Sequence, residues 1–262
     1  MCGGVRSGRL FRRCPVPSGN RNTAKDAMKI LACAFAYNEG DKIRRTLARH
    51  PRTRNYDLMV MDDGSTDGSL DQVPEGVLVL RNPRNCGIGA AMKRVFAYAL
   101  EQNYDVLVIQ AGNDKDDPLE IPRLLAPILE NRADFVQGSR FLPGGGYGNT
   151  PAYRILATRF LHPWLFSLAA RKRVTESTNG FRAFRTTILR DPRVNWQQPW
   201  LNRYELEPYL LYKAIRLGYR HMEVPVTKVY PPHREGYTKM KPFSGWWSIL
   251  RPVVYLLLGI KK

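Results

Sequence analysis

The sequence is short of the residues that build metal centres and disulfide frameworks. Its 262 residues include only four histidines, which are scattered, and four cysteines, none of which form a CxxC pair. This pattern argues against a zinc site, and a chain of this length rarely depends on disulfides. We therefore expect a protein of a reducing compartment whose fold rests on an apolar core. The cysteines are Cys2, Cys14, Cys33 and Cys86.

Long apolar segments are missing as well. No apolar run reaches the roughly 20 residues that a membrane-spanning helix needs. Residues 1–28 lack the apolar core of a secretory signal and are rich in Arg, Gly, Ser, Asn and Pro, which predicts a disordered basic extension. The most apolar segment, residues 245–260, is interrupted by Arg251 and Pro252. It favours an amphipathic C-terminal helix, residues 243–262, at a membrane interface. We expect a cytoplasmic protein that can associate peripherally with the cytoplasmic face of the membrane.

Acidic residues are scarce relative to basic ones. The chain has 23 Asp and Glu against 41 Lys and Arg, which gives a net charge of +18. Residues 1–29 carry +6 of this charge and residues 213–262 carry +8, which leaves +4 for the middle of the chain. Basic surfaces attract nucleic acids, anionic lipids or phosphate-bearing substrates. A nucleic-acid-binding domain would spread basic and aromatic residues over one face, so we expect no nucleic-acid partner.

Short apolar runs alternate with segments of helical periodicity along residues 29–242. This alternation is typical of an α/β fold with a mostly parallel central sheet flanked by helices. No linker or internal repeat divides the segment, so we expect one domain, with a flexible glycine-rich loop at 144–148. Strands are predicted at 29–36, 56–62, 77–80, 106–111, 135–138 and 221–226, and a turn with a strand at 177–185. Helices are predicted at 41–49, 88–102, 119–131, 153–170 and 204–217.

Polar clusters follow three of the predicted strands directly, at residues 37–40, 62–67 and 113–117. In parallel sheets, ligands bind beyond the carboxyl ends of the strands. We therefore expect these clusters to converge on one edge of the sheet and to form a binding site there.

Two adjacent carboxylates, Asp62 and Asp63, end the second predicted strand. They repel each other unless a donor compensates, and the N–H groups of a uracil or guanine ring are such donors. The first predicted strand ends in Ala36 and Tyr37, followed two residues later by Glu39, where backbone amides and a carboxylate can meet a ligand. The alternative for both segments is local: a helix start that satisfies its own backbone donors, and a solvated Asp-Gly turn.

Small residues gather at the start of the helix predicted at 88–102. Gly87, Gly89 and the two alanines that follow would let the backbone approach a phosphate or another element. The spacing matches neither a dinucleotide fingerprint nor a P-loop. We therefore favour packing against a neighbouring element as the main role of these residues.

Three acids lie within four residues after the fourth predicted strand: Asp114, Asp116 and Asp117. Hard divalent cations prefer such oxygen ligands, and a cation here would bridge a diphosphate and offset the charge on a leaving nucleoside diphosphate. Lys115 stands among the acids and could neutralise them without a metal. Asp116 and Asp117 could instead cap the helix that begins near Pro118.

The second half of the chain offers two further polar segments. Asn179 and Arg182 follow a glycine-centred turn and could hold a sugar or a phosphate, or could belong to an amphipathic edge strand. Glu205 and Glu207 could hold sugar hydroxyls or accept a proton, or could be a solvated helix start. A basic loop over residues 233–239 could close over a diphosphate, or could be only a surface loop.

Taken in order along the chain, these segments resemble the family 2 glycosyltransferases of the GT-A fold. The resemblance is strongest to the branch that contains dolichyl-phosphate mannosyltransferase and related polyprenyl-phosphate sugar transferases, and it covers roughly residues 29–242. Its carriers are Tyr37-Asn38-Glu39, Asp62-Asp63-Gly64-Ser65, Asn85 with Gly87-Ile88-Gly89-Ala90-Ala91, Gln137-Gly138-Ser139-Arg140, Asn179-Gly180-Phe181-Arg182 and Arg234 with Lys239.

The resemblance implies a single GT-A nucleotide-diphospho-sugar transferase domain. Such enzymes are typically inverting and use Mg²⁺ or Mn²⁺ held by an Asp-x-Asp motif. It implies that a UDP- or GDP-sugar is the donor and that four residues contact its base and ribose: Ala36, Tyr37, Glu39 and Asp63. It also implies three cations on phosphates of the donor or of a lipid-phosphate acceptor: Arg140, Arg234 and Lys239.

The chain departs from that family at the metal motif. Relatives usually carry Asp-Ala-Asp shortly before a proline, and counting back from Pro118 the acid positions here are Ala111 and Asn113. An Asp-x-Asp occurs three residues later, at Asp114 and Asp116. We therefore expect a shifted metal site formed by Asp114 and Asp116 with support from Asn113 or Asp117, in which Asp116 also serves catalysis.

The nature of the acceptor follows from what each acceptor needs. A lipid phosphate is ionised near neutral pH and needs no strong base, whereas a sugar hydroxyl needs one, for which Glu205 and Glu207 are the candidates. The basic, Trp-bearing C-terminus favours an anionic membrane surface, and with it a polyprenyl or dolichyl phosphate acceptor.

Two other functions stay open, and a third lacks a loop that it would need. The protein could transfer sugar to a glycan hydroxyl in surface polysaccharide synthesis. It could also be a silent relative that binds the nucleotide sugar without transfer. A nucleotidyltransferase would carry a Gly-rich, Lys-containing loop after the first strand, which residues 37–40 lack.

Overall fold

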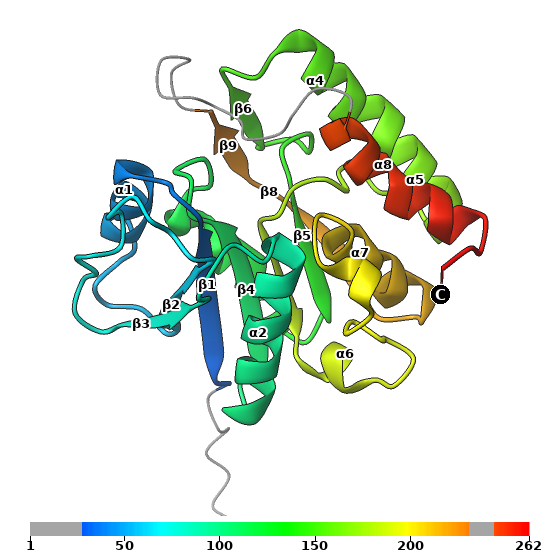
Figure 1. Ribbon diagram of the computed structural model, residues 1–262. Helices are drawn as coiled ribbons and strands as arrows, with labels where there is room; N and C mark the ends of the chain where they lie inside the picture. Colours follow the sequence, from blue (N-terminus) through cyan, green and yellow to red (C-terminus); the bar gives the residue numbers. More distant parts are fainter. Residues whose placement is uncertain (1–27, 231–243, 262) are drawn as a thin grey trace, which may run out of the picture.

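A seven-stranded sheet forms the centre of the protein (Figure 1). Its strands are β1 (Ile30–Ala36), β2 (Asp57–Asp62), β3 (Val77–Arg81), β4 (Val106–Ala111), β5 (Phe135–Ser139), β7 (Arg182–Arg185) and β8 (His221–Pro225). The computed structural model describes residues 28–230 and 244–261, and in it the strands lie in the order β3-β2-β1-β4-β7-β5-β8. Strand β7 runs antiparallel to β4 and β5, whereas the other neighbouring pairs are parallel. The predicted α/β fold with a mostly parallel sheet is confirmed.

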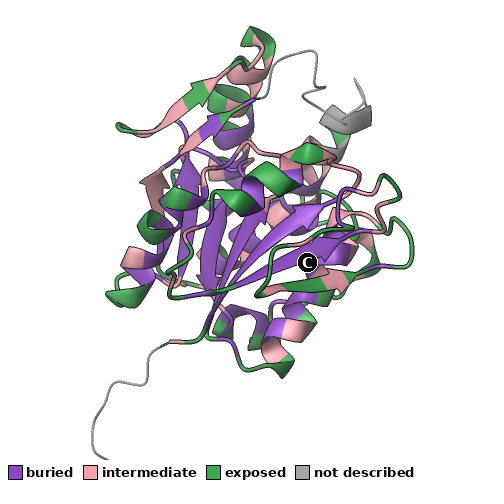
Figure 2. Cartoon of the chain, turned by 90° about the vertical axis from the view of Figure 1, so that its left-hand side faces the viewer, coloured by how far each residue is buried: buried purple, intermediate pink, exposed green. Residues whose placement is uncertain are grey.

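Strand β1 is buried along its whole length because it is paired on both sides and covered on both faces. Successive side chains of a strand point to opposite faces. Leu31 and Phe35 accordingly pack into one apolar cluster, and Ile30 and Ala34 pack into a second. A continuous apolar run is what a strand covered on both faces requires. Figure 2 shows the central strands of the sheet buried between partly exposed helices, whereas the edge strand β3 is partly exposed.

Helices cover both faces of the sheet. The cluster on one face includes α1 (Asp41–Ala48) and α3 (Ile121–Leu129), and α3 is preceded by a 3-10 turn, η1 (Pro118–Glu120). The cluster on the other face includes α2 (Ile88–Glu101), α5 (His162–Ala170), α7 (Leu206–Arg216) and α8 (Ser244–Leu257). Two short elements, α6 (Thr187–Arg190) and η3 (Pro199–Leu201), lie between β7 and α7.

The helix predicted at 153–170 is built from three successive pieces. These are α4 (Ala152–Leu156), a π-helical segment η2 (Ala157–Leu161) and α5. They form one long rod that lies beside α8 (Figure 1). Helix α8 forms most of the C-terminal helix predicted at 243–262, and it packs on α5 and α7. Within residues 28–230 and 244–261, no helix has the length and apolar character needed to cross a membrane.

A second sheet of two short parallel strands lies beside the main one. It pairs β6 (Gly146–Gly148) with β9 (Thr227–Val229). The sequence predicted a loop at residues 144–148, because a three-residue strand rich in glycine carries no apolar alternation. Strand β9 also forms an antiparallel bridge between Lys228 and Asp116, which ties the acidic loop to the far end of the chain.

The register of the strands brings the predicted polar clusters to one edge. Ala36 at the end of β1 lies opposite Asp62 at the end of β2, and Phe35 lies opposite Ala111 at the end of β4. The N–H of Asp63 donates to the carbonyl oxygen of Ala36 at 2.9 Å. Residues 37–40, 62–67 and 113–117 therefore leave the sheet side by side, as the parallel arrangement predicted.

Candidate functional site

A cavity of about 560 Å³ opens at this edge of the sheet, which is within the usual size range for a small-molecule site. Residues from the ends of β1, β2 and β4, the start of α2 and the 203–207 segment line its walls. Six predicted binding or catalytic residues line it: Ala36, Tyr37, Glu39, Asp63, Gly87 and Glu207. Eight others do not: Asp62, Asp114, Asp116, Asp117, Arg140, Asn179, Arg182 and Glu205. The predicted phosphate-binding residues Arg234 and Lys239 lie outside the described residues.

Asp63 fastens the loop that follows β3. Its Oδ1 accepts hydrogen bonds from Asn82 Nδ2 at 2.6 Å and from the N–H of Cys86 at 3.0 Å. Its Oδ2 accepts from the N–H of Gly87 at 2.8 Å. The carboxylate thus sets the position of the first residues of α2 on the cavity wall, a role that its place after an apolar strand did not reveal.

Asp62 is fully buried and is held by protein groups. Its Oδ1 accepts from the N–H of Ser65 at 2.8 Å, and Arg81 Nε lies 2.7 Å from its Oδ2. Arg81 and the backbone therefore offset the repulsion between the two neighbouring carboxylates. No nucleobase donor is needed for that purpose at Asp62.

The small residues at the start of α2 allow a close approach of the backbone. A Cβ on Gly87 would lie 2.7 Å from the carbonyl oxygen of Asn202, and one on Gly89 would collide with the carbonyl oxygens of Leu201 and Arg203. Gly87 also has a φ of 95°, which favours glycine. The predicted packing role is confirmed, and Gly87 lines the cavity in addition.

The acidic loop is divided among separate protein partners. Asp114 faces α1, where Arg45 Nε lies 2.6 Å from its Oδ2 and Arg49 Nη2 lies 2.8 Å from its Oδ1. Asp117 caps the turn η1, because its Oδ1 accepts from the N–H of Leu119 at 3.1 Å.

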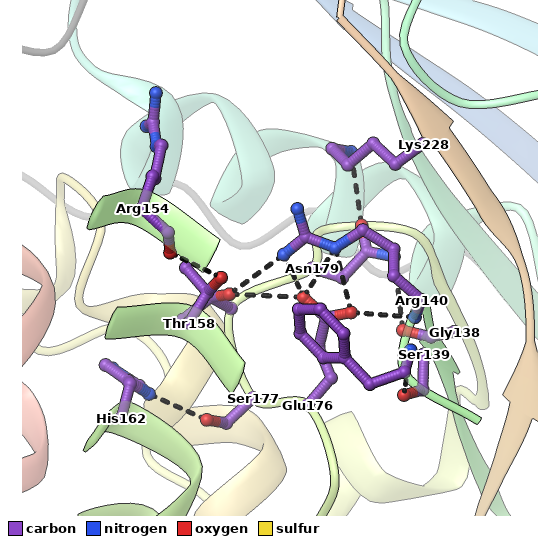
Figure 3. Close-up of polar contacts among 12 residues, drawn as sticks. Gly138, Ser139, Arg140, Arg154, Thr158, His162, Glu176, Ser177, Asn179 and Lys228 are labelled. Carbon is purple, nitrogen blue, oxygen red and sulfur yellow. Dashed lines mark hydrogen bonds and ion pairs between the residues drawn. The ribbon is translucent and has the colours of Figure 1, made fainter. Parts of the chain in front are cut away.

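Asp116 is fully buried. Its Oδ1 pairs with the ammonium of Lys228, and its Oδ2 accepts from the N–H of Ala111 at 3.1 Å. Lys228 also donates to Asn179 Oδ1 at 3.1 Å (Figure 3). From the sequence, Lys115 was the residue that could neutralise the acids without a metal. In the structure it is Lys228 that pairs with Asp116.

The residues present do not fit a divalent cation. No group of three His, Cys, Asp or Glu side chains among the described residues is placed to hold one. At the family's usual acid positions the chain has Ala111 and the neutral amide of Asn113. The cavity wall already carries five basic side chains, which are Lys42, Lys115, Arg154, Arg203 and Lys228. It carries three carboxylates, which are Glu39, Asp63 and Glu207.

Lys115 and Arg154 are cavity residues to which the sequence gave no binding role. The ammonium of Lys115 lies 4.3 Å from the centre of the Tyr230 ring, and the guanidinium of Arg154 lies 5.6 Å from it. Burial, together with the nearby charges of Lys228 and Arg154, lowers the pKa of Lys115 to about 7. Lys228 lies in β9 and Tyr230 follows that strand, more than 100 residues after the acidic loop, so no local sequence pattern connects them to it.

Arg140, predicted to hold a phosphate, forms a buried ion pair instead (Figure 3). Its Nε donates to both carboxylate oxygens of Glu176 at 3.0 Å, and its backbone N–H donates to Oε2 at 2.9 Å. Arg140 is 5% exposed and Glu176 is 0% exposed. The Arg140 side chain therefore serves the fold rather than the cavity wall.

Arg182 and Asn179 are also buried next to the cavity without lining it. Arg182 is 1% exposed, and it donates to the carbonyl oxygen of Glu207 at 2.9 Å and to that of Asn179 at 2.6 Å. Asn179 Nδ2 donates to the carbonyl oxygen of Gly138 at 3.1 Å. These bonds fix the backbone from which Glu207 reaches the cavity.

The two predicted bases differ in position. Glu207 lines the cavity, and its Oε1 lies 3.5 Å from Arg182 Nη2. Glu205 is 1% exposed and pairs with Arg251 of α8. Its Oε2 accepts from the N–H of Arg203 at 3.2 Å. Of the two, Glu207 alone can meet a ligand in the cavity.

An exposed apolar face begins at Leu156, two residues after Arg154, on the α4–α5 rod. Leu156, Phe160, Trp164 and Leu168 are 55–65% exposed and follow one another at intervals of four residues. Residues four apart share one side of a helix. Trp247 and Leu258 at the two ends of the neighbouring α8 are exposed as well. We call these six residues the apolar face.

Comparison with known proteins agrees with this architecture. The model of the family "Glycosyl transferase family 2" matches residues 33–192. An undecaprenyl-phosphate mannosyltransferase of Micrococcus luteus is 32% identical over 213 residues, which cover 77% of this chain and 84% of that protein. A polyprenol monophosphomannose synthase of Mycolicibacterium smegmatis is 28% identical over 226 residues, which cover 83% of each chain.

Solved structures share the fold. The glucosyl-3-phosphoglycerate synthase of Mycobacterium tuberculosis, crystallised with Mn²⁺, UDP and glucosyl-3-phosphoglycerate, superposes with a TM-score of 0.64. The likeness covers 95% of this chain and 86% of that one, at 20% identity. At this identity the likeness speaks for the fold alone.

Proposed function

Because the chain belongs to glycosyl transferase family 2 and is a nucleotide-sugar-dependent glycosyltransferase, we propose that its acceptor is a polyprenyl phosphate at a membrane surface. The observation that carries this proposal is the apolar face, which begins at Leu156, two residues after the cavity residue Arg154. The names of the two relatives, undecaprenyl-phosphate mannosyltransferase and polyprenol monophosphomannose synthase, support the same acceptor class. Both names specify mannose, so a mannose donor is the first to test.

The donor nucleotide would occupy the part of the cavity at the ends of β1 and β2. Ala36, Tyr37 and Glu39 line that part, and Asp63 anchors the loop that carries Gly87 beside it. The wall is rigid here because each of these residues leaves a buried strand or is tied to one. Rigid walls reduce the entropy lost when the ligand is ordered.

In the reaction, an oxygen of the acceptor phosphate attacks the anomeric carbon of the sugar. The bond between that carbon and the diphosphate oxygen breaks, the nucleoside diphosphate leaves with the electron pair, and the configuration at carbon inverts. A phosphate monoester is an anion near neutral pH, so the attack needs no general base. The cations on the cavity wall would hold the two anionic groups together in spite of their mutual repulsion.

The apolar face would place the protein on the lipid surface that contains the acceptor. Moving a large apolar side chain out of water contributes about 1.5–3 kcal/mol, so Phe160 and Trp164 alone would contribute several times the thermal energy. Arg171, Lys172 and Arg173 follow α5 directly and would attract anionic headgroups. The cavity mouth beside Arg154 would then face the membrane, where the lipid phosphate lies.

A glycan hydroxyl is the second candidate acceptor. The position of Glu207 on the cavity wall favours it, because a hydroxyl nucleophile needs a base within reach. The two candidates differ in their dependence on Glu207 and on the membrane.

The test uses the full chain with a panel of UDP- and GDP-sugars. Release of nucleoside diphosphate and formation of glycolipid are measured with a short, water-soluble polyprenyl phosphate and with a long one embedded in vesicles. We expect release that depends on the polyprenyl phosphate. The double variant Phe160→Ser/Trp164→Ser should lose most of its transfer to the embedded acceptor and keep its transfer to the soluble one.

Leu119→Ser is the matched control, because Leu119 is also a large apolar side chain, 62% exposed, but lies on η1 outside the apolar face. It should behave like the wild type with both acceptors. Equal loss in Leu119→Ser and in the double variant would contradict the membrane role of the apolar face. Release that needs a glycan and ignores polyprenyl phosphate would replace this proposal with the second candidate.

A further inference from the structure

We propose that the donor diphosphate is bound here by the ammonium groups of Lys115 and Lys228 in place of a divalent cation, so that donor binding does not require a metal. The inference rests on the proposed function, since it assumes a nucleoside-diphosphate donor. It departs from the metal site that the family resemblance implied at Asp114, Asp116 and Asp117.

Asp116 is already neutralised within the protein. It is fully buried, and both of its carboxylate oxygens are occupied, one by Lys228 and the other by the N–H of Ala111. A metal ion at Asp116 would have to displace Lys228 and leave that ammonium buried without its partner. Removing one partner from a buried ion pair is strongly unfavourable, so the pair resists exchange for a metal.

Lys115 and Lys228 come from backbone segments that are paired to each other. The N–H of Val229 donates to the carbonyl oxygen of Lys115 at 3.1 Å, next to the bridge between Asp116 and Lys228. Both lysines line the cavity, and Tyr230 supports Lys115 from one side. The pairing therefore brings two ammonium groups to the part of the wall that continues from the end of β4.

The charges of the wall suit an anion rather than a second cation. Five basic side chains and three carboxylates line the wall, and one of the five, Lys228, is paired with Asp116 behind the wall, so basic groups remain in excess. Asp63, one of the three carboxylates, already accepts three hydrogen bonds from the protein. A divalent cation entering this region would be repelled by the lysines. A diphosphate would be attracted by the excess of basic groups.

The lysines can supply the electrostatic part of the reaction. As the bond between the anomeric carbon and the diphosphate oxygen breaks, negative charge grows on that oxygen. Ammonium groups fixed beside it stabilise the charge by hydrogen bonding, and no proton needs to be transferred. Lysine is suited to this because its ammonium is a compact point charge with three donors.

The test measures binding rather than turnover. Calorimetric titrations of the full chain with UDP and GDP are compared in EDTA and in Mn²⁺, with uridine and guanosine as ligands that lack phosphate. We expect the diphosphate of the preferred base to bind in EDTA with an affinity within about threefold of that in Mn²⁺, because the lysines replace the metal.

Lys115→Gln should weaken diphosphate binding in EDTA by about tenfold to hundredfold, the usual range for loss of a charged hydrogen bond. It should leave nucleoside binding nearly unchanged. Lys213→Gln is the control, since Lys213 lies on α7 outside the cavity. Thermal denaturation of both variants verifies that they are folded.

The outcomes separate this inference from the proposed function. Diphosphate binding that appears in Mn²⁺ and vanishes in EDTA overturns the inference and leaves the proposed function standing. Equal affinities of Lys115→Gln and Lys213→Gln for the diphosphate overturn the role of Lys115. A protein that binds no nucleoside diphosphate under either condition overturns both.

Discussion

The ion pair between Arg140 and Glu176 offers the sharpest test of how the interior is organised. The change is Glu176→Gln, which keeps the shape of the side chain and removes its charge. Arg140 would then remain buried with a charge and without a counter-charge, because it is 5% exposed and its guanidinium faces Glu176. Breaking a buried pair in this way costs about 3–5 kcal/mol.

A loss of this size is readily measured by thermal or urea denaturation. In a domain of this length, 1 kcal/mol corresponds to a change of about 2–4 °C in Tm, so Glu176→Gln should lower Tm by roughly ten degrees. The double variant Arg140→Met/Glu176→Leu should recover much of the loss, since apolar residues of similar volume can replace a buried pair. Glu130→Gln is the control, because Glu130 pairs with Arg132 at the surface, where both side chains are more than half exposed. It should change stability by less than about 1 kcal/mol.

A Glu176→Gln variant as stable as Glu130→Gln would refute the reasoning. It would mean that Arg140 does not depend on Glu176 and is available for another partner. If that variant also bound the donor more weakly, Arg140 would hold a phosphate, as the family resemblance implied.

Three further predictions concern single titratable groups. Glu207→Gln should lower kcat less than about tenfold with a polyprenyl phosphate, whereas a hydroxyl acceptor that uses Glu207 as its base would lose about 10²–10⁴-fold. Glu205→Gln should instead lower Tm and leave kcat at permissive temperature nearly intact, because Glu205 pairs with Arg251 away from the cavity. Burial lowers the pKa of His162 from 6.5 to about 4, so the folded protein favours neutral His162. The stability from this group is full above pH 6.5 and is lost as the pH falls toward 4, by up to about 3 kcal/mol. Tm measured between pH 7.5 and 4.5 should therefore fall less in His162→Gln than in the wild type, and parallel curves would contradict the assignment.

The sequence was informative where short-range patterns decide the structure. The apolar runs of β1, β2 and β4 have no other way to be buried than in a covered sheet, and the polar residues after them must then meet at one edge. That reasoning was enough to identify Tyr37, Glu39 and Asp63 as cavity residues. The small residues around Gly89 likewise predicted a close contact, although they did not indicate which segment would make it.

Local sequence patterns were uninformative where contacts between distant segments of the chain decide the structure. Asp116 and Lys228 are 112 residues apart and meet through β9, a strand of three residues with no apolar alternation. An arginine that holds a phosphate and one that holds a buried glutamate look the same in a sequence, so the residues around Arg140 could not reveal that it pairs with Glu176. Glu205 and Glu207 were treated as equivalent, yet residues two apart on a helix do not share a side.

The walls of the cavity come from two parts of the chain, one inside the family match and one beyond it. The family match ends at residue 192, and five wall residues lie beyond it: Arg203, Tyr204, Glu207, Lys228 and Tyr230. The first part supplies the nucleotide side of the site at the ends of β1, β2 and β4, whereas the second part supplies β8 of the main sheet and the basic residue Lys228 of β9. Selection can therefore act on the charge and the acceptor side of the site separately from its donor side. A single replacement in β9, at Lys228, is enough to alter what neutralises Asp116.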